Sequence, residues 1–387
     1  MGDNIVEYTE VTTENNQYPP LTSSRKGIFL QTEYFAGNQI ASDDNTGYNI
    51  VPYGYFTYRH MSDDEVFHFN INDIVEKGIV STLYPVFTTD ENLDSRYLQY
   101  QLNYGHEFAK FAILQKQGGS RTYMYLNKLR QLHLTMPNHV EEQKAISSFF
   151  MNLDHLITLH QRKFDKLQVL KKAMLEKMFP KNGSSVPEIR FKGFTDAWEQ
   201  RKLEDYLTVS AEKNTDNLYT KKDVLSVSGD FGVVNQIEFQ GRSFAGASVS
   251  NYGVVHTGDV VYTKSPLKAN PYGIIKANKG KPGIVSVLYG VYHTRENANA
   301  DFIQMYFEQD ARLNNYLRPL VNKGAKNTLL ISDTDALEGE VCLAPTFDEQ
   351  KAIGQFFDSL DNLITLHQRE LEKLQNIKKS MLEKMFV

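Results

Sequence analysis

The chain has 387 residues, of which 41% are apolar and 23% charged, so it is long enough for two or three globular domains and too apolar for a disordered protein. Its single cysteine, Cys342, excludes a disulfide framework and a thiolate zinc cluster, and no run of about 18 apolar residues could span a membrane. The net charge is −5 and the N-terminus has no apolar leader, so we expect a cytoplasmic protein without a strongly basic domain.

Residues 1–140 read as the first globular domain, with mixed α/β content. β-Branched and aromatic runs at 53–59 and 79–88 predict strands, and a helix is expected at 95–114. Polar and aromatic residues gather at three places that we take as candidate DNA contacts, because Arg and Lys bind phosphates and base edges. Solvated turns are the alternative at each place. The candidates are Ser24, Arg25, Lys26, Tyr58, Arg59, His60, Ser120, Arg121 and Tyr123.

Residues 141–186 predict a long helix followed by a linker. Apolar residues recur at alternating spacings of three and four, which is typical of a coiled coil, and Pro180 ends the helix. The Gly and Ser residues at 181–185 indicate the linker. The residues expected to pair with another helix are Phe150, Leu153, Ile157, His160, Leu167 and Met174.

Residues 187–345 form a second mixed domain. Strands are expected at 253–262 and 283–292, and a helix at 300–321. The domain opens with a lead-in at 187–203 that has no counterpart in the first domain, so we expect the first domain to lack it. The candidate DNA contacts here are Lys264, Lys268, Lys323, Lys326 and Asn327.

Residues 346–387 predict a second long helix that repeats the first. Between 143–179 and 350–386, an offset of 207, 26 of 37 positions are identical, and weaker similarity extends upstream. The pairing residues of this helix are Phe357, Leu360, Ile364, His367, Leu374 and Met381. The chain is therefore a tandem repeat of one unit, a variable domain followed by a nearly constant helix, and its fold class is α+β.

The two helices are expected to pair with each other as a coiled coil. An antiparallel pair would carry the two domains at opposite ends, related by a pseudo-twofold axis, whereas a parallel pair would carry both at one end. His160 and His367 occupy matching seam positions, where we interpret them as a register-fixing polar layer in preference to a metal site.

The motifs of common catalytic sites are missing. The sequence has no phosphate-binding G-x-x-x-x-G-K-[ST] loop, no H-E-x-x-H, no G-x-S-x-G and no adenine methyltransferase motif. We therefore expect no catalytic, cofactor-binding or metal-binding residues in this chain.

The repeated unit resembles the specificity subunit of type I restriction–modification systems. The resemblance is carried by Pro137 with Glu142–Ile146, by Pro345 with Glu349–Ile353, by the Lys-x-x-Met-Leu-x-x-Met-Phe helix ends, and by the lead-in at 194–203. It implies two target recognition domains that read the halves of a bipartite asymmetric DNA site, separated by a helical spacer, which we expect to be the antiparallel coiled coil of the two long helices. It also implies two methyltransferase (M) subunits and restriction/translocase (R) subunits as partners, with S-adenosylmethionine, ATP and Mg bound by those partners and no membrane contact.

Two other functions stay open from the residues alone. One is a coiled-coil adaptor that binds only protein, and the other, disfavoured by the missing motif, is a stand-alone DNA methyltransferase.

Overall fold

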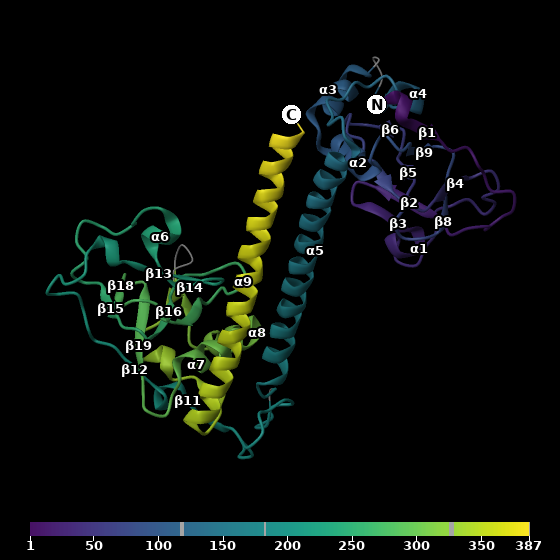
Figure 1. Ribbon diagram of the computed structural model, residues 1–387. Coiled ribbons are helices and arrows are strands. Elements are labelled where there is room, and N and C mark those ends of the chain that lie inside the picture. Colours follow the sequence, from purple (N-terminus) through teal and green to yellow (C-terminus); the bar gives the residue numbers. More distant parts are fainter. Residues whose placement is uncertain (117–119, 182, 325–328, 387) are drawn as a thin grey trace. The chain divides into compact units, whose positions relative to one another are not determined.

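The computed structural model describes residues 1–116, 120–181, 183–324 and 329–386 (Figure 1). The chain divides into two compact units, which we call unit 1 (Met1–Gln161 with Arg369–Val387) and unit 2 (Arg162–Gln368). Two long helices, α5 (Val140–Lys177) and α9 (Phe347–Met385), each begin in one unit and end in the other. Each unit thus contains a variable domain, the start of the helix that follows it and the end of the other long helix.

The core of unit 1 is built on a four-stranded antiparallel sheet. Its strands lie in the order β1 (Ile5–Glu7), β9 (Val86–Thr89), β5 (Phe56–Thr57) and β7 (Asn70–Ile71). Three two-stranded ladders accompany it: β2 (Leu21–Ser24) with β3 (Gly27–Leu30), β4 (Asn49–Pro52) with β8 (Lys77–Val80), and β6 (Met61–Ser62) with β10 (Thr122–Tyr123). Four short helices complete the domain: α1 (Gln31–Tyr34), α2 (Ser95–Tyr104), α3 (His106–Leu114) and α4 (Leu126–Leu129).

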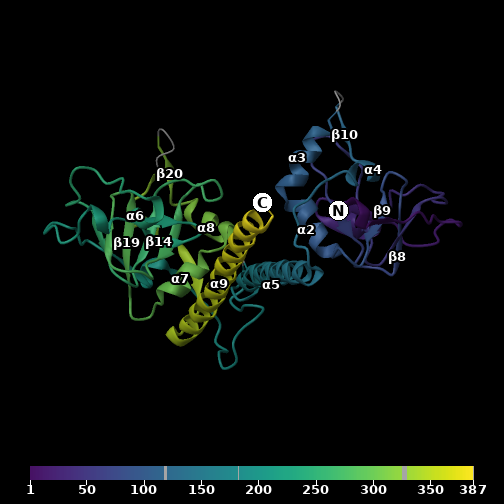
Figure 2. The same ribbon diagram turned by 45° about the horizontal axis from the view of Figure 1, so that its top comes forward.

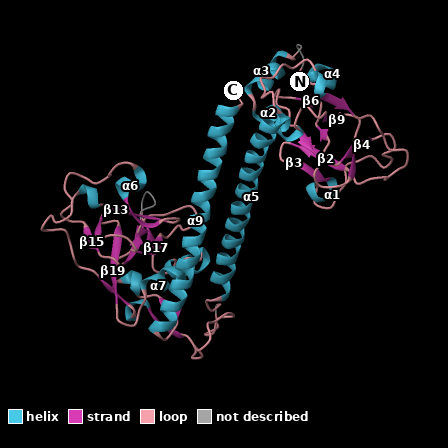
Figure 3. Ribbon diagram, in the orientation of Figure 1, coloured by secondary structure: helices cyan, strands magenta, loops and turns pink. Residues whose placement is uncertain are grey.

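Unit 2 repeats this plan. Its four-stranded antiparallel sheet has the order β12 (Leu207–Val209), β19 (Tyr289–Thr294), β16 (Val260–Thr263) and β17 (Ile274–Ala277). The ladders β13 (Leu225–Ser228) with β14 (Gly232–Asn235) and β15 (Gly253–Val255) with β18 (Gly283–Val285) match the first two ladders of unit 1. The helices are α6 (Gln236–Gln240), α7 (Ala300–Tyr306) and α8 (Asp310–Leu317). Both variable domains are thus mixed α/β, as the sequence predicts (Figure 3).

Two strand pairs of unit 2 have no partner pair of the same kind among the described residues of unit 1. β11 (Glu199–Lys202), at the end of the lead-in, pairs with β22 (Glu340–Leu343), just before α9. β20 (Asn322–Lys323) pairs with β21 (Leu329–Leu330).

A buried glutamine docks the start of each long helix on its own domain. In unit 1 the Gln143 amide accepts a hydrogen bond from the backbone N–H of Asp94 and donates one to the carbonyl of Pro137, both 2.9 Å long. In unit 2 Gln350 does the same with Asn299 and Ala344, also at 2.9 Å. Asp94 and Asn299 are the N-caps of α2 and α7, so the glutamine of the repeated Glu-Gln motif ties the long helix to a neighbouring helix end. Figure 2 shows α7 beside α9.

Within each unit, the segments of α5 and α9 contact each other in antiparallel register. In unit 1 Lys378 pairs with Asp154 at 2.5 Å, and Phe386 packs on Phe150. In unit 2 Lys171 pairs with Asp361 at 2.7 Å, and Phe179 packs on Phe357. In both units, residues later in α5 contact residues earlier in α9. The two helical segments are therefore antiparallel in each unit.

The seam expected from the heptad pattern agrees with the burial of the side chains. Every seam position of α5 from Phe150 to Met178 is buried or half-buried, as are those of α9 from Phe357 to Met381. Met385 is the exception at 37% exposed, whereas its counterpart Met178 is 2% exposed. His160 and His367 are half-buried at the expected positions, and the polar layer proposed for them stays a prediction.

Several of the longer runs expected within the two variable domains are interrupted in the structure. The helix at 95–114 divides into α2 and α3 at Gly105, where a Cβ would lie 2.5 Å from the Gln101 carbonyl oxygen. The strand at 253–262 divides into β15 and β16 at a turn where Gly258 has a φ of +91°, and the run at 79–88 likewise divides into β8 and β9. Among the described residues no helix is long and apolar enough to cross a membrane.

Candidate nucleic-acid interface

An acidic loop in unit 1 gathers the predicted arginines. Asp63 accepts a 2.8 Å hydrogen bond from Arg121 Nε, and Asp64 pairs with Arg25. The hydrogen bond from Arg25, with a second from Ser62, lowers the pKa of Asp64 to about 2, so this carboxylate stays charged at any physiological pH. Arg25 lies in the turn between β2 and β3 and Arg121 lies beside β10, so the loop brings together cations from distant parts of the chain.

An aromatic ladder adjoins this cluster. The ring of His60 stacks on Tyr125 at 4.9 Å between centroids, and Tyr125 stacks on Tyr123 at 5.9 Å. The Nδ1 of His60 donates to the Leu83 carbonyl, which fixes the ring, while Tyr123 and Tyr125 are 37% and 47% exposed. Two exposed phenol rings beside two guanidinium groups form a surface that can contact phosphates and bases.

The other candidates of unit 1 divide between turn and core. The Ser24 hydroxyl donates to the Gly27 carbonyl and closes the β2–β3 turn, on which Lys26 is exposed. Arg59 and Ser120 are also exposed.

Two described candidates are buried: His60 is 8% exposed beneath Tyr125, and Tyr58 is 0% exposed, which contradicts its prediction as a DNA contact. The side chain of Tyr58 is fully buried between Phe69 and Phe87, and its hydroxyl donates to the Met124 carbonyl at 2.9 Å. Its counterpart Tyr262 is equally buried and donates to the Tyr272 carbonyl. Tyr58 is therefore a core residue that positions the chain beneath the interface and cannot reach DNA.

The predicted lysines of unit 2 lie on a differently built surface. Lys264, the counterpart of His60, pairs with Asp333 at 2.7 Å, and Lys323 in β20 lies 5.1 Å from the ring centroid of Tyr272. Lys268 is exposed in the loop between β16 and β17, and Lys326 and Asn327 lie outside the described residues. The position of His60 in unit 1 is thus occupied by a lysine, Lys264, in unit 2, and Lys323 is a further cation of that unit, beside Tyr272.

Sequence reasoning missed the acidic and aromatic parts of these surfaces. Asp63 and Asp64 look like ordinary solvated loop residues, and nothing in their spacing reveals that they hold arginines from 39 and 58 positions away. Tyr125, by contrast, could have been found, because it follows Tyr123 with strand spacing.

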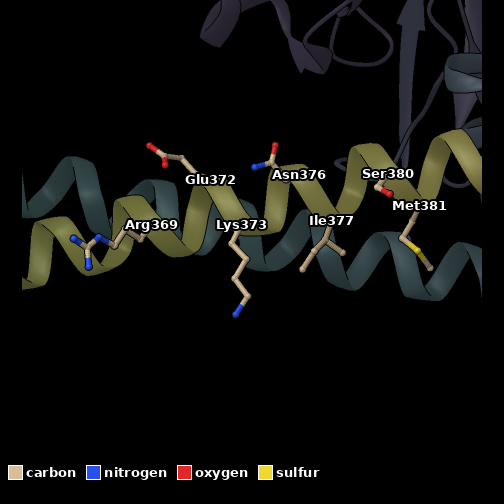
Figure 4. Close-up of a pocket in the computed structure, with 7 residues that line it drawn as sticks. All are labelled: Arg369, Glu372, Lys373, Asn376, Ile377, Ser380 and Met381. Atoms are coloured by element: carbon tan, nitrogen blue, oxygen red, sulfur yellow. The ribbon is translucent and has the colours of Figure 1, made fainter. Parts of the chain in front are cut away.

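The long helices also expose leucines outside the seam positions. Leu156 and Leu159 of unit 1 are 40% and 38% exposed, and their repeat counterparts Leu363 and Leu366 of unit 2 are 44% and 52% exposed. Exposed leucines that recur at the same helical positions indicate a surface for binding protein. Ile377 of α9 is also exposed in unit 1 and lies in an open hollow of about 570 Å³ (Figure 4). Figure 4 shows the residues that line it: Arg369, Glu372, Lys373, Asn376, Ile377, Ser380 and Met381.

No cluster of His, Cys, Asp and Glu residues in the described part of the chain could hold a metal ion. Two mixed domains, each with its own cationic and aromatic surface, and a duplicated helical segment define a class of protein with two variable modules on a repeated helical scaffold.

Comparisons with known proteins specify that class. The chain is 24% identical over 303 residues to a Methanocaldococcus jannaschii protein named as the type I restriction enzyme MjaX specificity subunit, covering 75% of this chain and 67% of that one. It is 23% identical over 323 residues to the MjaVIII specificity subunit of the same organism, covering 79% and 73% of the two chains. No family model matches the chain.

The fold agrees with these sequence relatives. The crystal structure of the type I restriction–modification S subunit from M. genitalium superposes with a TM-score of 0.56 at 12% identity, covering 100% of this chain and 94% of that one. The resemblance to type I specificity subunits drawn from the sequence is thereby confirmed, and the relatives favour a recognition subunit over an adaptor or a stand-alone methyltransferase.

Proposed function

We propose that this chain is the non-catalytic DNA-recognition subunit of a type I restriction–modification enzyme, and that each unit reads one half of a bipartite asymmetric site. The observation that carries the proposal is the duplicated scaffold with two different surfaces: His60 with two tyrosines in unit 1, and Lys264 with Lys323 in unit 2. Because base readout depends on which donors and acceptors face the groove, two different surfaces select two different half-sites.

The long helices hold the half-sites at a fixed spacing in this proposal. The antiparallel contacts within each unit support a coiled coil that carries the target recognition domains at opposite ends, related by a pseudo-twofold axis. Because α5 has 38 residues, a continuous helix of that length spans about 57 Å.

The partners are double-stranded DNA, two methyltransferase subunits and restriction/translocase subunits in a cytoplasmic complex. The repeated exposed leucines support two equal docking surfaces, one on each unit, and therefore two copies of one partner. S-adenosylmethionine, ATP and Mg are assigned to those partners and none to this chain. With a net charge of −5, the chain leaves most phosphate contacts to the partners while it reads bases.

The test is methylome sequencing of cells that express the chain with its methyltransferase partner. Replacing residues 1–140 by the same region of a relative with another specificity is expected to change one half-site and preserve the other. Replacing 187–345 is the matched experiment and should change the opposite half-site. If both half-sites changed together, or if the assembled complex showed no sequence preference in a gel shift, the recognition function would be refuted.

A further inference from the structure

The hairpin of β13 and β14 ends in a turn that differs from its counterpart in unit 1. The flanking strands correspond, because Leu225–Ser228 repeats Leu21–Ser24 and each pairs antiparallel with the strand that follows it. In unit 1 two residues, Arg25 and Lys26, connect the strands, whereas unit 2 has three, residues 229–231. The same scaffold thus carries a cationic turn in one unit and the turn Gly-Asp-Phe in the other.

The last residue of this turn, Phe231, presents a large apolar ring to solvent. It is 64% exposed, and its ring contacts that of Phe239 in α6 at 5.4 Å between centroids. Phe239 is itself 44% exposed, so the two rings form a patch on the surface, which we call the aromatic pair. The backbone N–H of Phe231 donates to the Ser228 hydroxyl at 3.3 Å, and Gly232 closes the turn with a φ of +71°. The turn and Phe239 together hold the ring in place.

The aromatic pair lies on the side of unit 2 that carries the candidate cations. In unit 1 the equivalent turn belongs to the arginine cluster on the acidic loop. In unit 2 Val227, in the strand before the turn, packs on the same core as Tyr272, whose ring lies 5.1 Å from the Lys323 ammonium. Figure 2 shows α6 at the same end of unit 2 as β20, the strand that carries Lys323. The turn therefore continues the candidate interface of unit 2.

The chemistry of the turn fits a base and not a phosphate. None of residues 229–231 is a cation, so the turn offers no charge attraction to phosphates. A phenylalanine ring contacts apolar groups, and the apolar group that the major groove presents is the C5 methyl of thymine. The major groove also admits a two-stranded β-ribbon, which is the form of the β13–β14 pair. Because Phe231 rests on Phe239, its ring is held at the surface of the ribbon and does not extend as a wedge between base pairs.

We propose that Phe231 is a specificity-determining residue of unit 2, whose ring contacts the methyl group of a thymine in the major groove. The inference rests on the proposed recognition function and assigns one base to one side chain. Phe239 is a positioning residue that supports the ring. The equivalent turn of unit 1 carries Arg25, whose guanidinium suits the O6 and N7 acceptors of guanine, so the same ribbon selects different bases in the two half-sites.

The experiment couples removal of the ring to removal of the methyl group. Methylome sequencing identifies the site, and replacement of residues 187–345 shows which half unit 2 reads. Labelled duplexes are then made in which each thymine of that half, on either strand, is replaced by deoxyuridine, which lacks only the C5 methyl. Anisotropy gives the affinity of the chain assembled with its methyltransferase partner.

One deoxyuridine is expected to weaken binding by the unaltered chain about fourfold, the effect of removing one methyl group from an apolar contact. Phe231→Ala should weaken binding to the thymine duplex and show no further loss on that deoxyuridine duplex, because the ring and the methyl group act as a pair. Phe231→Leu retains an apolar side chain and should keep part of the sensitivity.

Leu218→Ala is the matched control, because Leu218 is 82% exposed in unit 2 but lies outside the hairpin. This variant should keep the full fourfold sensitivity. Phe231 and Leu218 are both exposed, so neither change disturbs the core, and the fluorescence of the buried Trp198 checks that unit 2 is folded.

Three results would overturn the proposal. They are a unit 2 half-site with no thymine on either strand, equal deoxyuridine sensitivity with and without the Phe231 ring, and an equal loss of affinity for specific and random DNA in Phe231→Ala. Each leaves the recognition function standing, because the unaltered complex still methylates a bipartite site. A complex without any sequence preference would instead refute the recognition function, and this inference with it.

Discussion

At the scale of single residues, the most informative side chains are the two glutamines that repeat at 143 and 350. Both are almost fully buried, at 2% and 0% exposure, and both bond a backbone N–H at a helix N-cap and a carbonyl before the long helix. Sequence comparison of the copies shows that the Glu-Gln motif is retained but gives no reason, because the partner groups lie about 50 residues away.

Replacing Gln350 by Ala is expected to destabilise unit 2 by about 2–3 kcal/mol, because it leaves a buried N–H and a buried carbonyl unpaired. Trp198 is the chain's one tryptophan and is buried in unit 2, so its fluorescence during denaturant unfolding reports this unit. Gln355→Ala, at an exposed position of the same helix, is the control and should change stability by less than about 0.5 kcal/mol. Equal losses in the two variants would refute the role given to Gln350.

Arg121 is predicted to contact DNA once it leaves Asp63. Exposed ion pairs contribute only about 0–1 kcal/mol, so DNA can replace the carboxylate at little cost. Arg121→Ala in the assembled complex should weaken binding by about 1–3 kcal/mol if the side chain reads a base, and the loss should be larger on the specific site than on random DNA. Asp63→Asn should have the opposite sign and strengthen binding to random DNA.

The control for these variants is Arg96→Ala, because Arg96 pairs with Asp73 and not with the acidic loop. An equal loss on specific and random DNA, with a smaller salt dependence, would reassign Arg121 to a phosphate contact. Unchanged binding would remove it from the interface.

Residue types were a partial guide to this interface. Arg25, His60, Arg121 and Tyr123 do gather in one region, because short polar turns at strand ends lie on the surface by necessity. The prediction that Tyr58 contacts DNA was wrong, because the pattern Tyr-Arg-His does not reveal which of its three side chains are buried in the core. Thr57 and Tyr58 are both 0% exposed and His60 is 8% exposed, whereas Arg59 is exposed, so burial in this segment does not follow the simple alternation of a strand.

At the scale of elements, the heptad seam was predictable and the ends of the strands were not. A period of 3.5 residues over some 38 positions identifies a coiled-coil helix even without a structure. The runs at 79–88 and 283–292 have the composition of strands throughout, yet a turn divides each of them into two strands. Apolar composition alone does not reveal where such a turn interrupts a strand.

The two seam lysines, which the sequence marks only as polar interruptions, form matching ion pairs across the helices. Lys378 bonds Asp154, and its ammonium group also lies 4.9 Å from the ring centroid of Tyr104. Asp154 in turn accepts a 2.6 Å bond from Tyr100, whose pKa is raised by burial and by this bond. Lys171 and Asp361 form the equivalent pair in unit 2.

Lys378→Asp is therefore expected to destabilise unit 1 by about 1–3 kcal/mol, since it removes a partly buried pair and places two carboxylates together. The double variant with Asp154→Lys should recover most of the loss. Amide hydrogen exchange is the measurement, because it reports residues of unit 1 separately from those of unit 2. Lys379→Asp, a neighbouring exposed lysine, serves as the control; a loss as large there, or no recovery in the double variant, would contradict the pairing.

At the scale of the whole molecule, the proposed ruler predicts how the DNA site responds to a longer helix. Four residues inserted after Gln168 lengthen α5 by about 6 Å, while DNA rises about 3.4 Å per base pair. Methylome mapping should show the spacer between half-sites longer by about one or two base pairs, with unchanged half-sites because no variable domain is altered.

The control inserts the same four residues between Gly183 and Ser184, in the linker outside the helix, and should leave the spacer as it was. Full activity with an unchanged spacer in the α5 variant would show that the helices do not set the distance.

The way the units share the chain has a consequence for biosynthesis. Unit 2 is one continuous stretch, Arg162–Gln368, whereas unit 1 needs both Met1–Gln161 and Arg369–Val387. Phe386, which lies near the end of α9, is 1% exposed in the core of unit 1 and packs on Tyr97 and Phe150. During synthesis on the ribosome, unit 1 therefore cannot complete its fold until residues 369–387 have emerged. Unit 2 has all of its residues available before that point. Until then unit 1 presents an open aromatic core, so it is the part of the nascent protein that most needs chaperone protection.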